Sequence, residues 1–157
     1  MIRVAKSEDA SDLASMLEDF NLEFGEPSPG EEFLASRVEA LIDGDSKRFL
    51  IAHPGKQPAG GPPDGFAQID LRPSVWSEGP VALLEELYVK PQRRGKGLGR
   101  ELLDSVLGFA RSEGAAMAEV ITGEDDTAAR GLYESFGFRN RVEGEGQARA
   151  LYYELEL

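Results

Sequence analysis

The stretch from Val89 to Gly99 reads Val-Lys-Pro-Gln-Arg-Arg-Gly-Lys-Gly-Leu-Gly, and it decides the fold of this chain. A strand pattern ends at Pro91, three glycines follow at alternate positions, and an apolar pattern of helical spacing begins among them. Glycine lets the backbone turn tightly and approach a ligand closely. The first amides of a helix have no partner inside the helix, and the helix dipole makes their surroundings positive. The stretch therefore predicts a site for an anion such as a pyrophosphate.

Basic residues gather at this stretch although the chain as a whole is acidic. They are Arg93, Arg94, Lys96 and Arg100. The 157 residues carry a formal net charge of −12, which argues against a nucleic-acid partner because such proteins present a basic face. An acidic surface is compatible with a cationic substrate such as an amine. The local reversal of sign indicates that the basic residues serve an anionic ligand.

Two other phosphate-binding loops fit the stretch poorly. A P-loop needs Gly-Lys-Ser/Thr, whereas Gly97 is preceded by Lys96 and followed by Leu98. A dinucleotide fingerprint needs the spacing G-x-G-x-x-G, whereas the glycines here alternate with single residues up to Gly99. A plain turn between a strand and a helix is the structural alternative, and it does not account for the four basic residues.

Composition excludes several other kinds of site. The chain has no cysteine, which excludes disulfides, thiolate metal sites and a cysteine nucleophile. His53 is the single histidine, and we expect it to be an ordinary residue at a strand end, with no metal bound. No apolar run approaches the roughly 18 residues that a membrane span needs, and no signal-peptide pattern follows Met1. The sequence predicts a single cytoplasmic domain over residues 1–157, without a membrane partner.

Apolar periodicity and turn residues predict the elements of the chain. In order they are a strand at Ile2–Ala5, helices at Glu8–Phe20 and Phe33–Ile42, strands at Arg48–Ala52, Gly65–Leu71 and Val81–Val89, a helix from Leu98 to Gly114, a strand at Ala118–Thr122, a helix at Asp126–Phe136, and strands at Phe138–Val142 and Ala148–Leu157. Residues 54–64 and Arg72–Gly79 are predicted as loops.

Two motifs in this order resemble those of one enzyme family. The segment Arg94–Gly99 matches the Q/R-x-x-G-x-G/A motif of the GNAT superfamily of acyl-CoA-dependent N-acyltransferases. The segment Ala129–Phe138 resembles the helix-to-strand motif A-x-x-L-Y-x-x-x-G-F of the same family. The resemblance covers essentially the whole chain. It implies an α/β (α+β) fold with a mixed, mostly antiparallel central sheet of about seven strands, flanked by about four helices.

The resemblance implies acetyl-CoA as the co-substrate. The backbone amides that would hold its pyrophosphate are those of Arg94, Gly95, Lys96, Gly97, Leu98, Gly99 and Arg100. The strand backbone at Leu87, Tyr88 and Val89 would pair with the pantetheine arm, in a splay beside the strand at Ala118–Thr122. Further along, Asp126 and Ala129 would lie beside the same arm.

Asp126 departs from the family pattern, because many members have asparagine at this position. A carboxylate can still cap the following helix, and Asp125 or Thr127 could serve as the cap instead. It accepts hydrogen bonds but cannot donate them as an amide does. The departure therefore affects only a side-chain contact with the CoA arm.

The resemblance also implies catalytic roles. The hydroxyl of Tyr133 would lie near the CoA sulfur and protonate the leaving thiolate as a general acid. A primary amine is mostly protonated at neutral pH and must lose a proton before it attacks a thioester. The segment around Glu85 resembles the Leu-Glu-Asp/Glu stretch of GNATs that act on polyamines, which implies Glu85 as the base, acting through water. Adjacent strand residues face opposite sides, so only one of Glu85 and Glu86 is expected to reach the acceptor, barring a bulge.

The acceptor pocket of this fold includes the first helices, the loop between them and later loops. The expected substrate-binding residues are Glu23, Glu26, Trp76 and Glu86. Acidic and aromatic groups suit a cation. The acceptor could be a small cationic metabolite, an aminoglycoside-like drug or a peptide amine, and the sequence does not separate these. The oligomeric state also stays open, with a homodimer as one possibility. A catalytically silent acyl-CoA-binding or sensory module is the alternative function.

Overall fold

The computed structural model describes residues 1–44, 46–54, 61–141 and 148–155. The chain divides into two compact units, Met1–Val120 and Ile121–Leu157, and each is described by itself. The elements are β1 (Ile2–Val4), a 3₁₀ turn (Ser7–Asp9), α1 (Ala10–Phe24), α2 (Glu31–Ile42), β2 (Lys47–Ala52), β3 (Gly65–Arg72), β4 (Val81–Val89), a 3₁₀ turn (Pro91–Arg93), α3 (Leu98–Ser112), β5 (Met117–Val120) and α4 (Thr127–Ser135). This order confirms the predicted one as far as α4.

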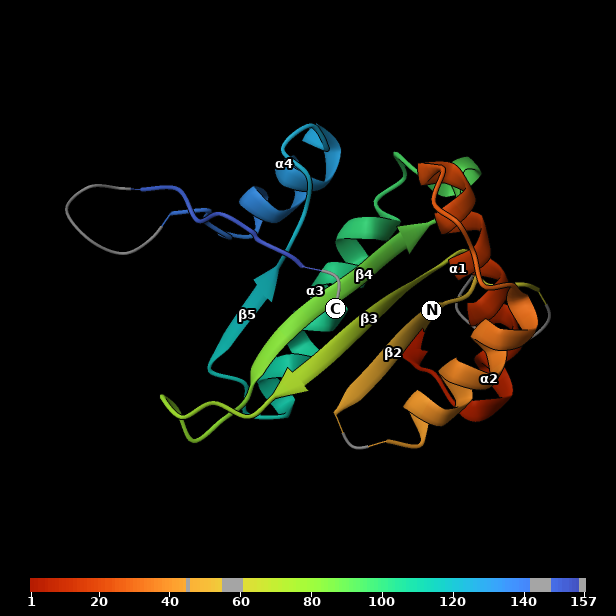
Figure 1. The fold of residues 1–157 in the computed structure, drawn as a ribbon, viewed down its shortest axis with the longest axis horizontal. Helices are drawn as coiled ribbons and strands as arrows, with labels where there is room; N and C mark the ends of the chain where they lie inside the picture. The colour runs from red at the N-terminus through yellow and green to blue at the C-terminus, as the bar shows by residue number, and fades with distance from the viewer. Residues whose placement is uncertain (45, 55–60, 142–147, 156–157) are drawn as a thin grey trace. The chain divides into compact units, whose positions relative to one another are not determined.

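The sheet has the strand order β1-β2-β3-β4-β5, as Figure 1 shows. The first four strands pair antiparallel, and β4 pairs with β5 in parallel. The mixed, mostly antiparallel sheet and the four α-helices agree with the prediction, counted over the part of the chain that the structure describes.

The expectation of about seven strands is wrong for the described residues, which form five. The missing two were expected at the C-terminus. There the described residues make an isolated antiparallel bridge between Arg141 and Arg149. Residues 142–147 and 156–157 lie outside the described chain. Between 148 and 155 the side chains are exposed, so the alternation of apolar residues there does not bury a face.

The two faces of the sheet carry different helices. One face packs on α1 and α2 in a buried cluster of Leu13, Met16, Val38, Phe49, Ile51, Phe66 and Tyr88. The other face packs on α3, which contacts β2, β3 and β4 and buries Leu102, Leu103 and Val106. Figure 1 shows α3 behind the strands. Burying an apolar side chain contributes about 1.5–3 kcal/mol, so these two layers stabilise the unit and hold β4 in place.

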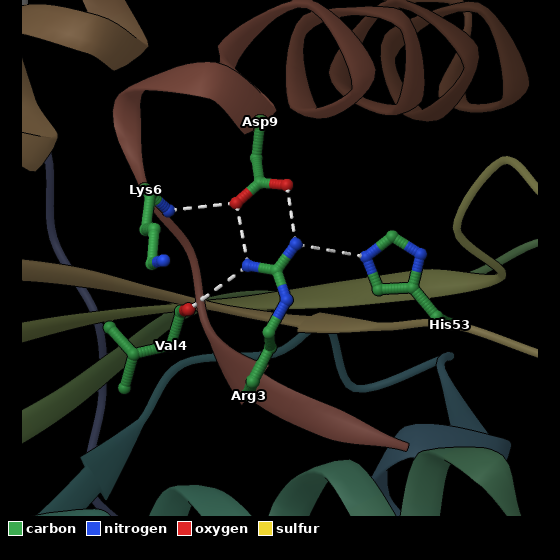
Figure 2. A network of polar contacts seen from close by, with 5 residues as sticks. All are labelled: Arg3, Val4, Lys6, Asp9 and His53. Atoms are coloured by element: carbon green, nitrogen blue, oxygen red, sulfur yellow. Dashed lines mark hydrogen bonds and ion pairs between the residues drawn. The ribbon is translucent and has the colours of Figure 1, made fainter. Parts of the chain in front are cut away.

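Asp9 anchors the N-terminal strand through a network of polar contacts (Figure 2). Two nitrogens of the Arg3 guanidinium donate to the two Asp9 carboxylate oxygens, each over 2.7 Å, and the Lys6 amide donates to Oδ2 over 2.8 Å. Asp9 is 5% exposed. The hydrogen bonds from Arg3 hold the pKa of this carboxyl below its usual range. This buried charge is therefore matched by donors and serves the fold.

His53 follows the end of β2 and takes part in the same network. Its backbone amide donates to the Met1 carbonyl over 2.9 Å. Its Nε2 lies 3.3 Å from Nη2 of Arg3, and because arginine can only donate, this nitrogen is the acceptor. These contacts agree with the predicted strand-end role.

The second unit is built around α4. The Asp126 carboxylate accepts a hydrogen bond from the Ala129 amide over 2.9 Å, so the predicted helix cap is confirmed. Gly137 follows the helix with φ of 91°, a left-handed conformation that favours glycine at a helix end. The ring of Tyr133 packs against Phe138 with the centroids 5.9 Å apart.

In the part of the chain that the structure covers, no helix is both long and apolar enough to cross a membrane.

Candidate active site

A glycine turn joins β4 to α3. Pro91 opens a short 3₁₀ turn, because its fixed φ suits the first position of a helical turn and its missing N–H is not needed there. Gly95 and Gly97 then take φ of 70° and 90°, which side chains with a Cβ adopt only with strain. No atom lies within 4 Å of where a Cβ would stand at either glycine. The space beside these two α-carbons is therefore open.

The N-terminus of α3 faces this opening. Its first backbone hydrogen bond runs from the Glu101 amide to the Gly97 carbonyl over 3.0 Å. Among the described residues, no backbone carbonyl accepts from the amides of residues 95–99. Free amides at the positive end of a 15-residue helix make a site for an anion. The amides of residues 95–99 thus fit the predicted pyrophosphate site. The amide of Arg94, which was also predicted to hold this group, does not fit, because it donates to the Pro91 carbonyl over 3.2 Å.

The basic side chains of the turn are partly engaged with the protein. Arg93 pairs with Asp64 over 3.0 Å. Lys96 Nζ donates to the Gln92 carbonyl over 3.0 Å. Both contacts are made at the surface and are individually weak. Arg93 and Lys96 can therefore exchange them for a phosphate group.

Arg94, the first residue of the motif, is tied to α1. Its guanidinium makes a two-pronged pair with Glu23, both bonds 2.6 Å long, and its Nε donates to the Val89 carbonyl over 2.8 Å. The guanidinium also lies 5.8 Å from the centre of the Tyr88 ring. The hydrogen bonds from Arg94 lower the pKa of Glu23. Glu23, predicted to bind substrate, therefore has a cationic partner within the protein.

β4 continues beyond the end of its neighbour β5. The parallel pairing covers residues 81–84 of β4 and ends at Leu84 and Val120. Beyond that point β4 has, among the described residues, no strand on this side. The Lys90 amide donates to the Asp64 carbonyl, on the β3 side. Because the backbone alternates along an antiparallel strand, Tyr88 also turns its polar backbone atoms toward β3, whereas Leu87 and Val89 turn theirs to the open edge.

This geometry sharpens the predicted pairing with a pantetheine arm. Leu87 and Val89 offer backbone groups at the open edge, although the Val89 carbonyl already accepts from Arg94. Tyr88 offers none there, because it pairs with Phe66 of β3. Its ring instead enters the core on the α1 side.

A β-bulge lies in β4 where the pairing with β5 ends. Gln68 of β3 pairs with Glu86, and the next residue, Ile69, pairs with Leu84. Glu85 is therefore the extra residue of the bulge. Before the bulge the even-numbered residues face α3, and after it they face α1 and α2. A bulge re-aims side chains in this way.

The bulge places both acidic residues on one face of the sheet. Glu86 shares the face of its partner Gln68. Glu85 reaches the same face, because its Oε2 accepts hydrogen bonds from Gln68 Nε2 and, over 2.6 Å, from Lys47 Nζ. The expectation that these two residues face opposite sides is wrong, for the reason that the bulge interrupts the alternation. Lys47 also lies 3.5 Å from Asp70.

Among the described carboxylates, Glu86 has the most strongly shifted pKa. Burial, and second the charge of Glu85, raise the pKa of Glu86 to about 7. Burial disfavours the charged form of an acid, and a neighbouring carboxylate does the same. Groups that titrate near neutral pH in a partly buried position are characteristic of functional sites.

The other predicted acceptor residues are dispersed. Glu26 is exposed in the segment between α1 and α2, close in sequence to Glu23. Trp76 is 94% exposed in the loop between β3 and β4. That loop precedes β4, whereas the glycine turn follows it, so the nine-residue strand of about 30 Å separates them. Within the first unit, the structure therefore does not bring Trp76 to the glycine turn.

Two residues beside the acidic pair Glu85 and Glu86 were not predicted. Lys47 and Gln68 both contact Glu85, and they come from β2 and β3. No motif marks them in the sequence, because their contact with Glu85 depends on strand register and on the bulge.

The comparisons with known proteins agree with this geometry. The model of the acetyltransferase (GNAT) family matches residues 13–138. A crystal structure described as that of a "putative acetyltransferase from Arthrobacter sp. FB24" is 46% identical in sequence to this chain. The match covers 100% of this chain and 96% of that one, with a TM-score of 0.87.

Two curated relatives have named activities. Thialysine N-epsilon-acetyltransferase of Sus scrofa is 26% identical over 93% of this chain and 88% of its own length. Aminoglycoside N(6')-acetyltransferase type 1 of Stenotrophomonas maltophilia is 29% identical over 79% of this chain and 76% of its own length. The chain belongs to the acetyltransferase (GNAT) family. It is an N-acetyltransferase, and acetyl-CoA is the co-substrate of its family.

Proposed function

We propose that this chain acetylates the primary amine of a small cationic molecule, by direct attack on acetyl-CoA in a ternary complex. The observation that carries the proposal is the open turn at Gly95 and Gly97 before the free amides of α3, on a chain of the GNAT family. The relatives named for aminoglycoside and thialysine support an amine as the acceptor.

The co-substrate supplies an acetyl group that is activated as a thioester. Its pyrophosphate would be held by the backbone amides of the turn and the first turn of α3, from Gly95 to Arg100. The open edge of β4 at Leu87 and Val89 would pair with the pantetheine arm. Asp126 and Ala129 would lie beside this arm, with the carboxylate already engaged as the cap of α4.

The acidic groups would receive the acceptor. The bulge brings Glu85 and Glu86 to one face of the sheet, where their charge suits an ammonium group. One of these carboxylates would take the proton that the amine loses, and the family resemblance favours Glu85. Glu26, beyond the end of α1, would add negative potential at the approach, whereas the charge of Glu23 is matched by Arg94.

Tyr133 is proposed to protonate the departing CoA thiolate as a general acid. Replacement Tyr133→Phe removes the hydroxyl and keeps the ring that packs on Phe138. We expect kcat to fall by about 100-fold, with the Kd for acetyl-CoA within two-fold of wild type by calorimetry. An unchanged kcat would refute the role. Phe138→Leu, which alters the same packing without touching a hydroxyl, is the matched control.

The family model crosses the boundary between the two units, since it spans residues 13–138. We therefore propose that both units act as one domain. We also propose the cytoplasm as its place of action, where acetyl-CoA is available.

A thiol-release assay with acetyl-CoA and a panel of amines tests the function. The panel includes an aminoglycoside, thialysine, a polyamine and a peptide with a free N-terminus. We expect CoA release with at least one small cationic amine, and acetylated product by mass spectrometry. Turnover only with the peptide would show that the acceptor is a peptide amine and not a small cationic molecule. Tight binding of acetyl-CoA without turnover on any amine would instead indicate a silent binding module.

A further inference from the structure

The two adjacent carboxylates at the bulge differ in their partners. Glu85 is occupied: one of its oxygens accepts from both Lys47 Nζ and Gln68 Nε2. Its charge is matched by a cation at 2.6 Å. Glu86 has neither. Among the described residues, no cation or hydrogen-bond donor reaches its carboxylate.

Glu86 is also withdrawn from solvent. It belongs to the half-buried part of β4 and pairs across the sheet with Gln68, whose amide nitrogen is turned to Glu85 instead. A half-buried carboxylate without a donor is costly to keep charged. Such a group gains most when it receives a proton or an ammonium ion, and this is the property that a general base needs.

We propose that Glu86 accepts the proton of the substrate ammonium group, and that Lys47 is a positioning residue that holds Glu85 beside it. The inference rests on the proposed acetyl transfer and assigns the base within it. Lys47 fixes Glu85 as a neighbouring anion, and that anion favours the protonated form of Glu86.

The reaction balances as follows. The ammonium group of the acceptor gives one proton to the Glu86 carboxylate and becomes a neutral amine. Its nitrogen forms the new bond to the acetyl carbon, and the carbon–sulfur bond breaks. As the amide forms, the nitrogen releases its second proton to solvent, and the sulfur leaves as a thiol with a proton from the general acid, which regains one proton from solvent. Glu86 then returns its proton to solvent.

The charged groups around Glu86 come from each neighbouring strand. They are Glu85 on β4, Asp70 on β3 and Lys47 on β2. The helices α1 and α2 cover this face with apolar residues, and the α1 acids Asp19 and Glu23 act on Tyr88. Burial and Glu85 together raise the pKa of Glu86 to about 7, in line with its proposed role.

Carbon-13 detection of the glutamate carboxyl groups tests the inference without turnover. In the full chain, one carboxyl is expected to titrate near pH 7, and Glu86→Gln should remove that signal. Lys47→Met should move its midpoint to higher pH, because Glu85 then loses its counter-charge. Glu85→Gln should move it to lower pH. Persistence of the signal in Glu86→Gln, or its loss in Glu85→Gln, would overturn the assignment.

Kinetics provide the second readout. In Glu86→Gln, kcat/KM for the amine should fall about 100-fold. The acid limb of the pH profile should shift to higher pH in Lys47→Met and to lower pH in Glu85→Gln. A 100-fold loss in Glu85→Gln with an active Glu86→Gln would overturn the proposal. Arg72→Met is the control, because it breaks the surface ion pair with Glu119 between strands of the same sheet. It should change neither kcat/KM for the amine nor the acid limb of the pH profile. Absence of turnover in wild type would reject the proposed function, whereas the carboxyl titration would still decide the state of Glu86.

Discussion

Asp9 and Glu86 are both withdrawn from solvent, and their pKa values move in opposite directions. The bonds from Arg3 lower the pKa of Asp9, whereas burial raises the pKa of Glu86 to about 7. The difference lies in the partners, since Asp9 accepts three hydrogen bonds (Figure 2) and Glu86 accepts none from the described residues. Burial of an acid therefore stabilises the fold only where donors surround it, and an acid without donors indicates a site for a ligand.

The largest expected effect concerns stability against pH. The raised pKa of Glu86 means that the folded chain holds a proton that the unfolded chain releases above about pH 4.5. The stability from this group is present below that pH and is lost as the pH rises to about 7. Relative to Glu86→Gln, wild type should lose roughly 2–3 kcal/mol of unfolding free energy between pH 5 and pH 8. Urea titrations at both pH values measure this. A constant difference would contradict the raised pKa.

Asp9→Asn should show the reverse behaviour. The substitution removes a charge that the Arg3 guanidinium needs, and we expect a loss of about 2 kcal/mol at pH 7. Because the pKa of Asp9 is lowered, its contribution is present above the ordinary pKa of an aspartate and disappears as the pH falls through the lowered value. Kinetic constants of the folded variant should match wild type. A variant with normal stability and lost activity would place Asp9 with the functional acids.

Glu23 is intermediate between Asp9 and Glu86. Like Asp9 it has a cationic partner within the protein, and like Glu86 it lies near the predicted site. Its pair with Arg94 is partly exposed, so Glu23→Gln should cost at most about 1 kcal/mol. We expect the KM for acetyl-CoA to rise about three- to five-fold, because Arg94 loses an anchor. The KM for the amine should stay constant. Glu26→Gln is the matched control from the same segment. A rise in the amine KM alone would make Glu23 an acceptor ligand.

The smallest effect is expected at Trp76. Its side chain is 94% exposed, at the end of β4 far from the turn. Trp76→Ala should change stability by less than about 0.5 kcal/mol and the amine KM by less than two-fold. A ten-fold rise in the amine KM would restore the role that the sequence suggested.

Features fixed by local chemistry could be predicted from the sequence. Gly95 and Gly97 take left-handed conformations where the spacing required them, and Asp126 caps α4 as expected. The order of elements as far as α4 followed from periodicity and turn residues, most clearly in α1 and α3, which bury the apolar residues of their own helical patterns.

Features that depend on distant residues could not be predicted. The bulge at Glu85 comes from the register with β3, and strict alternation gave the wrong face for one of the two acids. The contact with Lys47 joins residues 38 positions apart. The alternating pattern after Ala148 suggested a strand, yet its described side chains are exposed, and a pattern alone does not supply a pairing partner.

The central claim is that the acetyl group passes directly from CoA to an amine. Incubation with deuterated acetyl-CoA and the best amine of the panel, followed by mass spectrometry of the small molecules and the intact chain, tests it most directly. We expect one labelled acetyl group on the amine nitrogen for each CoA released, and no label on the protein. Labelled protein, or CoA release without labelled amine, would contradict the claim.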